Sequence, residues 1–76
     1  IAKKALEDFV LDVEPVSNQV VVKTTTAAAQ VIAESIDNLY IDNIVASIAG
    51  DNVVLIISND ETKAKEVAKT IENNIK

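Results

Sequence analysis

Two short segments of aliphatic residues constrain the fold more than any other feature of the chain. They are Gln19–Thr24 (QVVVKT) and Val53–Ile57 (VVLII). Val and Ile favour extended strands because their branched side chains pack well on a pleated surface. Side chains alternate between the two faces of a strand, so Val20 and Val22 point one way and Val21 the other. A sheet with one face in water should alternate apolar with polar residues, so we expect something outside this chain to cover the second face.

The first of the two segments is predicted to form a hairpin with the residues before it. Residues 9–16 alternate with a period of two, which places Phe9, Leu11 and Val13 on one face of a half-buried strand. The dipeptide 17–18 (Ser-Asn) supplies the turn residues between the two strands.

The second segment is predicted to form another hairpin. Short apolar runs over 44–49 and 53–57 flank a Gly-Asp-Asn turn. Gly50 in this turn is free to take a positive φ, which is the conformation that tight hairpin turns often need.

Two amphipathic helices are predicted, one after each hairpin. The first follows the Thr run at 24–26, where a Thr is an acceptable N-cap, and should end at about Asn38 or Leu39. Its expected core face is Ala29, Ile32, Ala33, Ile36 and Tyr40. Asn59-Asp60 should cap the second helix. The apolar stripe of that helix is Ala64, Val67, Ala68, Ile71 and Ile75.

The order of these elements predicts a two-layer α+β fold. It reads ββαββα, with a four-stranded antiparallel sheet and two helices on one face. We interpret residues 1–76 as a single domain, with 1–7 as the remnant of a linker. Because the chain begins with Ile1 rather than Met, we also interpret it as a fragment whose missing N-terminal part carries another activity.

The composition excludes several classes of function. The chain has no Cys and no His, so disulfides, thiolate metal sites and the commonest catalytic bases are excluded, and we expect no enzyme. Its net charge of −5 has the wrong sign for binding nucleic-acid phosphates. No run reaches the ~18 apolar residues of a membrane span, so we expect a cytoplasmic protein with no membrane partner. A core of 76 residues usually needs a further source of stability, and oligomerisation is the one that remains.

Three groups of polar residues are candidates for binding chemistry. They are Gln30, Glu34 and Asp37 at helical spacing, Asp51-Asn52 in the second turn, and Asp60-Glu61. The alternatives are a solvated acidic face, ordinary turn residues and helix capping, in that order. No metal-binding spacing is present. Carboxylates with a neighbouring amide suit a small cationic ligand such as a guanidinium.

The segments QVVVKT, AAAQVIAESIDNL, ASIAGDN and VVLIISND resemble the C-terminal domain of bacterial arginine repressors. The resemblance runs from Gln19 to Leu39 and again from Ile44 to Asp60. It implies a domain that forms trimers, two of which stack as a hexamer, with no cofactor but with L-arginine as effector. It also implies a winged helix-turn-helix N-terminal to this chain, through which alone operator DNA would be bound.

The resemblance further implies the ligand-binding residues. Gln30 and Asp37 would bind the amino-acid end of arginine at the interface between trimers. Asp51 would bind the guanidinium, Ala49 would contribute its backbone, and Ser47 stands where the family has Thr.

The chain departs from the family pattern at several of these positions. Asn52 replaces a second Asp of the turn, which removes one charge and presents an NH2 group where only acceptors suit a guanidinium. Val53 replaces a Thr, Ala46 replaces a Gly, and Thr26-Ala27 replaces Pro-Gly. Asn52 therefore leaves two readings open: an arginine sensor, or an arginine-insensitive paralogue that acts only as an assembly module.

Two other classes share features of this chain. Pterin dehydratases have a similar ββαββα layout, but their chemistry depends on His, which this chain lacks. Amino-acid-binding ACT-type domains have the order βαββαβ, which requires a helix directly after the first strand. The turn and second strand that follow Pro15 argue against that order.

Overall fold

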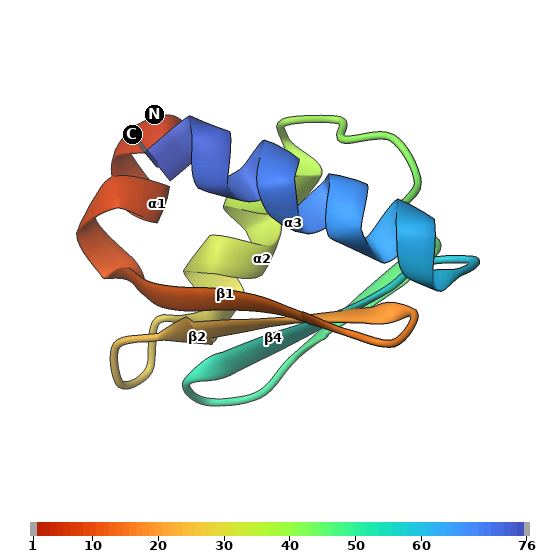
Figure 1. The fold of residues 1–76 in the computed structure, drawn as a ribbon. Helices are drawn as coiled ribbons and strands as arrows, with labels where there is room; N and C mark the ends of the chain where they lie inside the picture. Colours follow the sequence, from red (N-terminus) through yellow and green to blue (C-terminus); the bar gives the residue numbers. More distant parts are fainter. Residues whose placement is uncertain (1, 76) are drawn as a thin grey trace.

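The computed structural model describes residues 2–75 and arranges them as a four-stranded antiparallel sheet with helices on one face (Figure 1). The strand order is β1-β2-β4-β3. This confirms the predicted α+β fold and adds one helix before the first strand. The elements in chain order are α1 (Ala2–Phe9), β1 (Val10–Val16), β2 (Gln19–Thr24), α2 (Ala29–Asp37), β3 (Ala46–Ala49), β4 (Val53–Ile57) and α3 (Glu61–Ile75).

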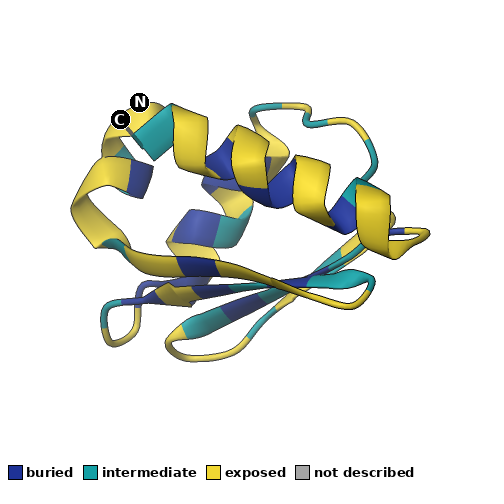
Figure 2. Ribbon diagram, in the orientation of Figure 1, coloured by how far each residue is buried: buried dark blue, intermediate teal, exposed yellow. Residues whose placement is uncertain are grey.

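The core lies between the two central strands and the helices. The side chains of Val20 and Val22 on β2, and of Val54 and Ile56 on β4, are fully buried. Val22 pairs with Val54 and Val20 with Ile56, so the four form one apolar surface beneath the helices (Figure 2). The two aliphatic segments thus form the two central strands, over the predicted residues.

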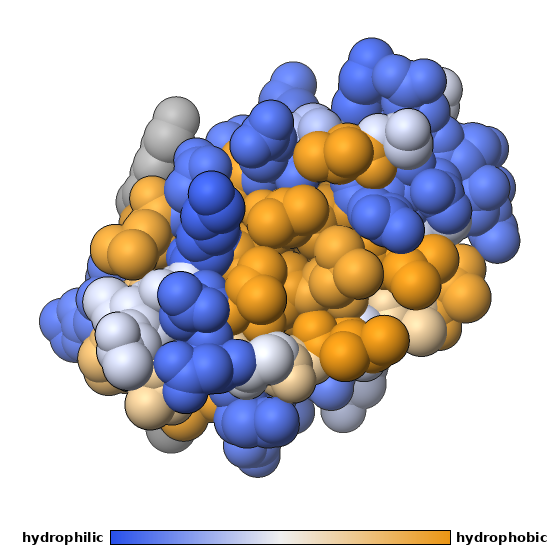
Figure 3. All heavy atoms as spheres, turned by 90° about the horizontal axis from the view of Figure 1, so that it is seen from below, coloured by the Kyte–Doolittle hydropathy of each residue, from blue (hydrophilic) through white to orange (hydrophobic). Residues whose placement is uncertain are grey.

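The opposite face of the sheet is also apolar. The register places Val21 beside Leu55 and Leu55 beside Ile48, in one row across three strands. We call the apolar residues that β2, β3 and β4 place on this face the outer-face patch: Val21, Ala46, Ile48, Val53, Leu55 and Ile57. Figure 3 shows apolar side chains gathered at the centre of this face with hydrophilic residues around them. No element within residues 2–75 covers it (Figure 1), and Ile48 is 63% exposed. Both faces of the central strands are therefore apolar, as predicted.

The first strand differs from its predicted pattern. Phe9 is the last residue of α1 rather than part of the strand. The register shifts between Val10 and Asp12, which marks a β-bulge. A bulge inserts one unpaired residue and so breaks the alternation of faces. Val13 is buried, but Leu11 is 68% exposed, so the prediction that Phe9, Leu11 and Val13 share one face is wrong.

Helix α2 begins without the predicted Thr cap. Its N-cap residue is Ala28, and no side chain caps the helix. The carbonyl oxygen of Asp51 instead accepts the N–H of Ala29 at 3.2 Å. Just before the cap, Ala27 has a φ of 66°, in the left-handed region that disfavours residues with a Cβ. Position 27 is where the family pattern has Gly.

Helix α2 ends at Asp37, one or two residues before the predicted end. Tyr40, three residues after this end, has a φ of 52° and is 87% exposed. The prediction that Tyr40 lies on the core face is therefore wrong. The helical spacing no longer applies to it because the helix has already ended. The earlier members of the face, Ala29, Ile32 and Ile36, are buried as predicted.

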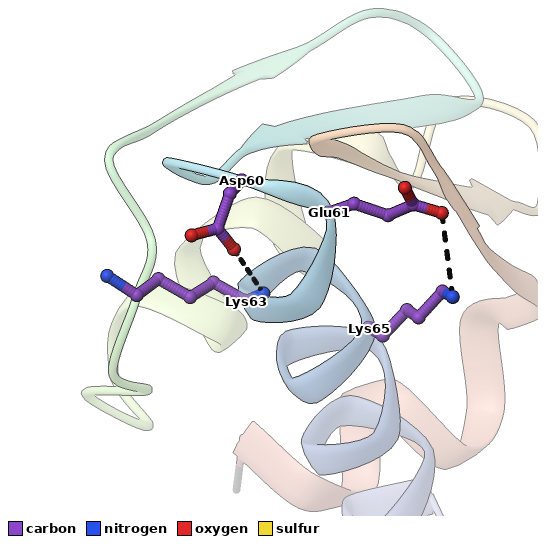
Figure 4. Close-up of polar contacts among 4 residues, drawn as sticks. All are labelled: Asp60, Glu61, Lys63 and Lys65. Atoms are coloured by element: carbon purple, nitrogen blue, oxygen red, sulfur yellow. Dashed lines mark hydrogen bonds and ion pairs between the residues drawn. The ribbon is translucent and has the colours of Figure 1, made fainter.

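Helix α3 has the predicted cap and the predicted stripe. A carboxylate oxygen of Asp60 accepts the backbone N–H of Lys63 at 2.8 Å (Figure 4). Glu61 and Lys65 form an exposed ion pair one turn along, at 3.5 Å. Ala64, Val67, Ala68 and Ile71 are buried and Ile75 is half-buried.

The second hairpin is shorter than predicted on its first side, because β3 begins at Ala46 rather than at 44. Gly50 donates its N–H to the carbonyl oxygen of Val53 at 2.8 Å. It does not have a positive φ, so that prediction is wrong.

The segment interpreted as a linker remnant, 1–7, lies mostly within helix α1; Ile1 is outside the described residues. Leu6 on this helix is fully buried in the core. Helix α1 contacts both α2 and α3 at one end of the helical layer (Figure 1).

Candidate functional site

The residues assigned to a ligand lie along one edge of the molecule, on helix α2, on the edge strand β3 and in the turn between β3 and β4. Gln30 and Asp37 are the second and last residues of α2, Ser47 and Ala49 are on β3, and Asp51 and Asn52 are in the turn. Helix α2 packs against β3 and β4, so these three elements are neighbours in the fold.

Backbone hydrogen bonds hold the β3–β4 turn against the start of α2. The carbonyl oxygen of Asp51 accepts the N–H of Ala29 at 3.2 Å, and that of Asn52 accepts the N–H of Thr24 at 2.9 Å. Gln30 follows Ala29 directly. The fold therefore brings Gln30, Asp51 and Asn52 to the same end of α2.

Ser47 and Ala49 lie on the side of β3 that faces the helices. Ser47 pairs with Ile56 and Ala49 with Val54, and both partners are fully buried beneath the helical layer. Paired residues of an antiparallel sheet share a face. Because β3 is an edge strand, Ser47 and Ala49 are only half-buried.

Asp37 lies at the other end of α2. Seven residues separate it from Gln30, which corresponds to about 10 Å along the helix axis. The two side chains lie on similar sides of the helix because seven residues make almost two full turns. A ligand that contacted both Asp37 and the β3–β4 turn would have to extend along α2.

The polar side chains of this edge are available for binding. Gln30, Asp37, Asp51 and Asn52 are all exposed. Within residues 2–75, their side chains take part in none of the hydrogen bonds or ion pairs that the protein forms with itself. Two carboxylates and two amides in this arrangement suit a ligand rich in N–H donors, such as a guanidinium or an ammonium group.

These residues line neither of two pockets found among the described residues. A pocket of about 380 Å³ lies between the α2–β3 connection and α3, and one of about 180 Å³ lies beside the bulge in β1. The first is lined by Leu39, Tyr40, Ile41, Asp42, Asn43, Glu66, Thr70 and Asn74, and the second by Val10, Leu11, Asp12, Val13, Glu72 and Ile75. Small-molecule sites usually enclose most of their ligand, and one copy of this edge does not.

Comparison with known proteins assigns the chain to a family. Residues 6–73 match the family described as the arginine repressor, C-terminal domain. The chain belongs to this family. The arginine repressor of Clostridium novyi is 42% identical over 75 residues, which cover 95% of this chain and 50% of that protein. Those of Clostridium acetobutylicum and Halothermothrix orenii are 44% and 30% identical, covering 87% and 93% of this chain and 44% and 47% of those proteins.

The arginine repressor domain thus spans about half the length of the curated relatives it matches. Membership of a repressor family, rather than of an enzyme family, confirms the prediction of a non-enzymatic domain. Between residues 2 and 75, no helix is long and apolar enough to cross a membrane, and no cluster of acidic residues could hold a metal ion.

The sequence did not reveal how this arginine repressor domain holds its candidate site in place. The turn is held by the backbone amides of Thr24 and Ala29, and a backbone hydrogen bond leaves no mark in the residue types. A partial signal was present at position 27, where the resemblance implies Gly. The left-handed φ of Ala27 is a conformation that Gly adopts without steric cost.

Proposed function

We propose that this chain is the oligomerisation and L-arginine-sensing domain of a transcriptional repressor of arginine metabolism. The observation that carries the proposal is the match to the arginine repressor family across residues 6–73. The assembly is a trimer, two of which stack as a hexamer. Operator DNA is bound by a winged helix-turn-helix N-terminal to this chain, and the protein acts in the cytoplasm.

The outer-face patch supports self-assembly. Its central row joins Val21, Leu55 and Ile48 across three strands, with no described element above it. Contiguous exposed apolar surface of this kind marks an interaction site. A chain of 76 residues without disulfides also gains stability by burying such surface against copies of itself.

The exposure of the candidate ligand residues supports a site completed by a second copy. In one chain, Asp37 and Asp51 are exposed, and their carboxylates line neither of the two pockets described above. A second copy docked against this edge would enclose the ligand between two surfaces and strengthen each polar contact by excluding water.

The mechanism is linkage between ligand binding and assembly. A ligand that contacts two copies at once binds the assembled form more tightly than the separate subunits. It therefore shifts the equilibrium towards assembly, and assembly in turn raises the affinity for ligand by the same factor. Assembly then holds the N-terminal winged helix-turn-helix domains of the copies in a fixed arrangement relative to one another.

Replacing Asp51 with Ala should abolish the effect of arginine on assembly. The substitution removes the carboxylate assigned to the guanidinium, and the loss of one charge-assisted hydrogen bond costs about 1.5–3 kcal/mol. The dissociation constant for L-arginine, measured by isothermal titration calorimetry, should rise roughly 10- to 100-fold. Unchanged arginine binding in this variant would refute the assignment of Asp51.

The matched comparison for this variant is Asn52→Asp, which restores the second acidic residue of the family pattern. It should lower the dissociation constant for arginine, because the guanidinium gains a second charged acceptor. If neither the native chain nor this variant responds to millimolar arginine, the domain is an assembly module rather than a sensor.

A further inference from the structure

The short segment that connects β2 to α2 makes contacts in two directions. On one side, the N–H groups of Thr24 and Ala29 donate to the carbonyl oxygens of Asn52 and Asp51, at 2.9 and 3.2 Å. On the other side, the N–H of Thr25 donates to the carbonyl oxygen of Phe9 at 2.9 Å. Phe9 is the last residue of α1.

The N–H groups of Thr24 and Thr25 are consecutive donors, so the β3–β4 turn and the end of α1 bind two adjacent peptide units that meet at the Cα of Thr24. A displacement of the turn that breaks the hydrogen bond from Thr24 to Asn52 leaves the φ and ψ angles of Thr24 less restrained. Rotation about these angles changes the direction of the N–H of Thr25 and so disturbs its bond to Phe9.

The same segment contains backbone strain. Ala27 has a φ of 66°, and alanine has no polar side chain that could compensate for this conformation by a local hydrogen bond. Such a conformation persists only where the surrounding contacts impose it. Here these contacts are the hydrogen bonds of Thr24 and Ala29 to the turn and the bond from the N–H of Ala28 to the carbonyl oxygen of Thr25, at 3.1 Å.

We propose that the segment Thr24–Ala29 is a strained link that positions the β3–β4 turn and couples it to the end of α1, with Ala27 as the positioning residue. The proposal rests on the proposed function in one respect, that Asp51 and Asn52 belong to the ligand site. When the hydrogen bonds to the turn open, Ala27 relaxes and the bond to Phe9 loosens. A ligand that holds the turn closed therefore also orders the end of α1.

Residue-resolved amide hydrogen exchange of the 76-residue chain tests the link through Ala27→Gly. Glycine adopts the left-handed conformation without steric cost, so the variant should favour the closed segment. We expect exchange at Thr24, Thr25 and Ala29 to slow about threefold to tenfold relative to the native chain, because relief of the strain exceeds the added freedom of glycine.

The matched control is Ser17→Gly. Ser17 also has a positive φ, of 54°, but lies in the turn between β1 and β2, away from the candidate site. In this variant, the amides of Thr24, Thr25 and Ala29 should exchange at the same rates as in the native chain. If Ser17→Gly slows them as much as Ala27→Gly does, the effect is general stabilisation and the link is refuted. The link is also refuted if Ala27→Gly slows Thr24 and Ala29 but leaves Thr25 unchanged.

Added L-arginine separates the link from the ligand assignment. In the native chain, arginine should slow exchange at the same three amides and in the last turn of α1. It should bind Ala27→Gly about threefold to tenfold more tightly, because the turn is already closed. If arginine affects no amide in any variant while Ala27→Gly still slows all three, the link stands and the ligand assignment fails. If arginine binds the native chain and Ala27→Gly equally, the ligand assignment stands and the link fails.

Discussion

Replacing Leu55 with Glu should prevent the proposed self-assembly and leave the protein as monomers. Leu55 lies in the central row of the outer-face patch, between Val21 and Ile48. In an assembly that covers this face, each copy would have to bury a carboxylate without a partner, which costs several kcal/mol per subunit. Analytical ultracentrifugation should show a single species with the mass of one chain.

The control for this experiment is Leu11→Glu. Leu11 is also an exposed leucine, but it sits at the bulge of β1 beside α3 rather than in the patch. Its mass distribution should match that of the native protein. Circular dichroism should show both variants folded, since the buried face of β4 is formed by Val54 and Ile56. A Leu55→Glu protein that keeps the native assembled mass would show that the patch is not the subunit interface.

Replacing Leu6 with Ala should lower the free energy of unfolding by about 2–5 kcal/mol, which is the usual cost of such a truncation in a packed core. Leu6 is fully buried and belongs to the same core cluster as Ile32 and Ile71. The size of the loss decides whether the first residues act as an attached linker or as part of the domain. Chemical denaturation at one fixed protein concentration measures it, since assembly makes stability depend on concentration.

Glu7→Ala provides the comparison, because Glu7 is exposed on the same helix. That variant should stay within about 0.5 kcal/mol of the native protein. If Leu6→Ala lowers the free energy of unfolding by as little as Glu7→Ala does, α1 does not pack on the core in solution.

The central strands and the last helix could be predicted from the sequence because each has a strong local signal. In β2 and β4, runs of β-branched residues leave few alternatives to a strand. In α3, Asp60 provides the cap and an apolar stripe repeats over four turns. In these elements the local preferences of the residues agree with the tertiary packing, so the structure has the strands and the helix that the sequence pattern predicts.

The predictions failed where tertiary contacts override the local pattern. A bulge in β1 exposes Leu11, although the alternation places it with Val13. The start of α2 takes its hydrogen-bond acceptor from Asp51, distant in sequence, so the nearby Thr residues are not needed as caps. The first residues were interpreted as a helical stretch or the remnant of a linker, and the sequence did not show that Leu6 would be fully buried in the core.

The candidate site depended on the resemblance more than on any residue pattern. Gln30, Asp37 and Asp51 are exposed polar residues of a kind found on any soluble surface. The structure adds that Gln30 and Asp51 lie at one end of α2, with Asp37 at the other. A site of the proposed kind, completed by a second copy, cannot be recognised from one chain alone, because part of its wall would belong to the neighbouring copy.

Sedimentation equilibrium of the native chain across a titration of L-arginine is the most direct test of the proposed linkage between arginine binding and assembly. If the domain senses arginine through assembly, the average mass should rise with arginine towards a hexamer, or the hexamer should persist at lower protein concentration. The midpoint of the change should depend on both arginine and protein concentration. A mass distribution that does not change up to millimolar arginine would show that arginine binding and assembly are not linked.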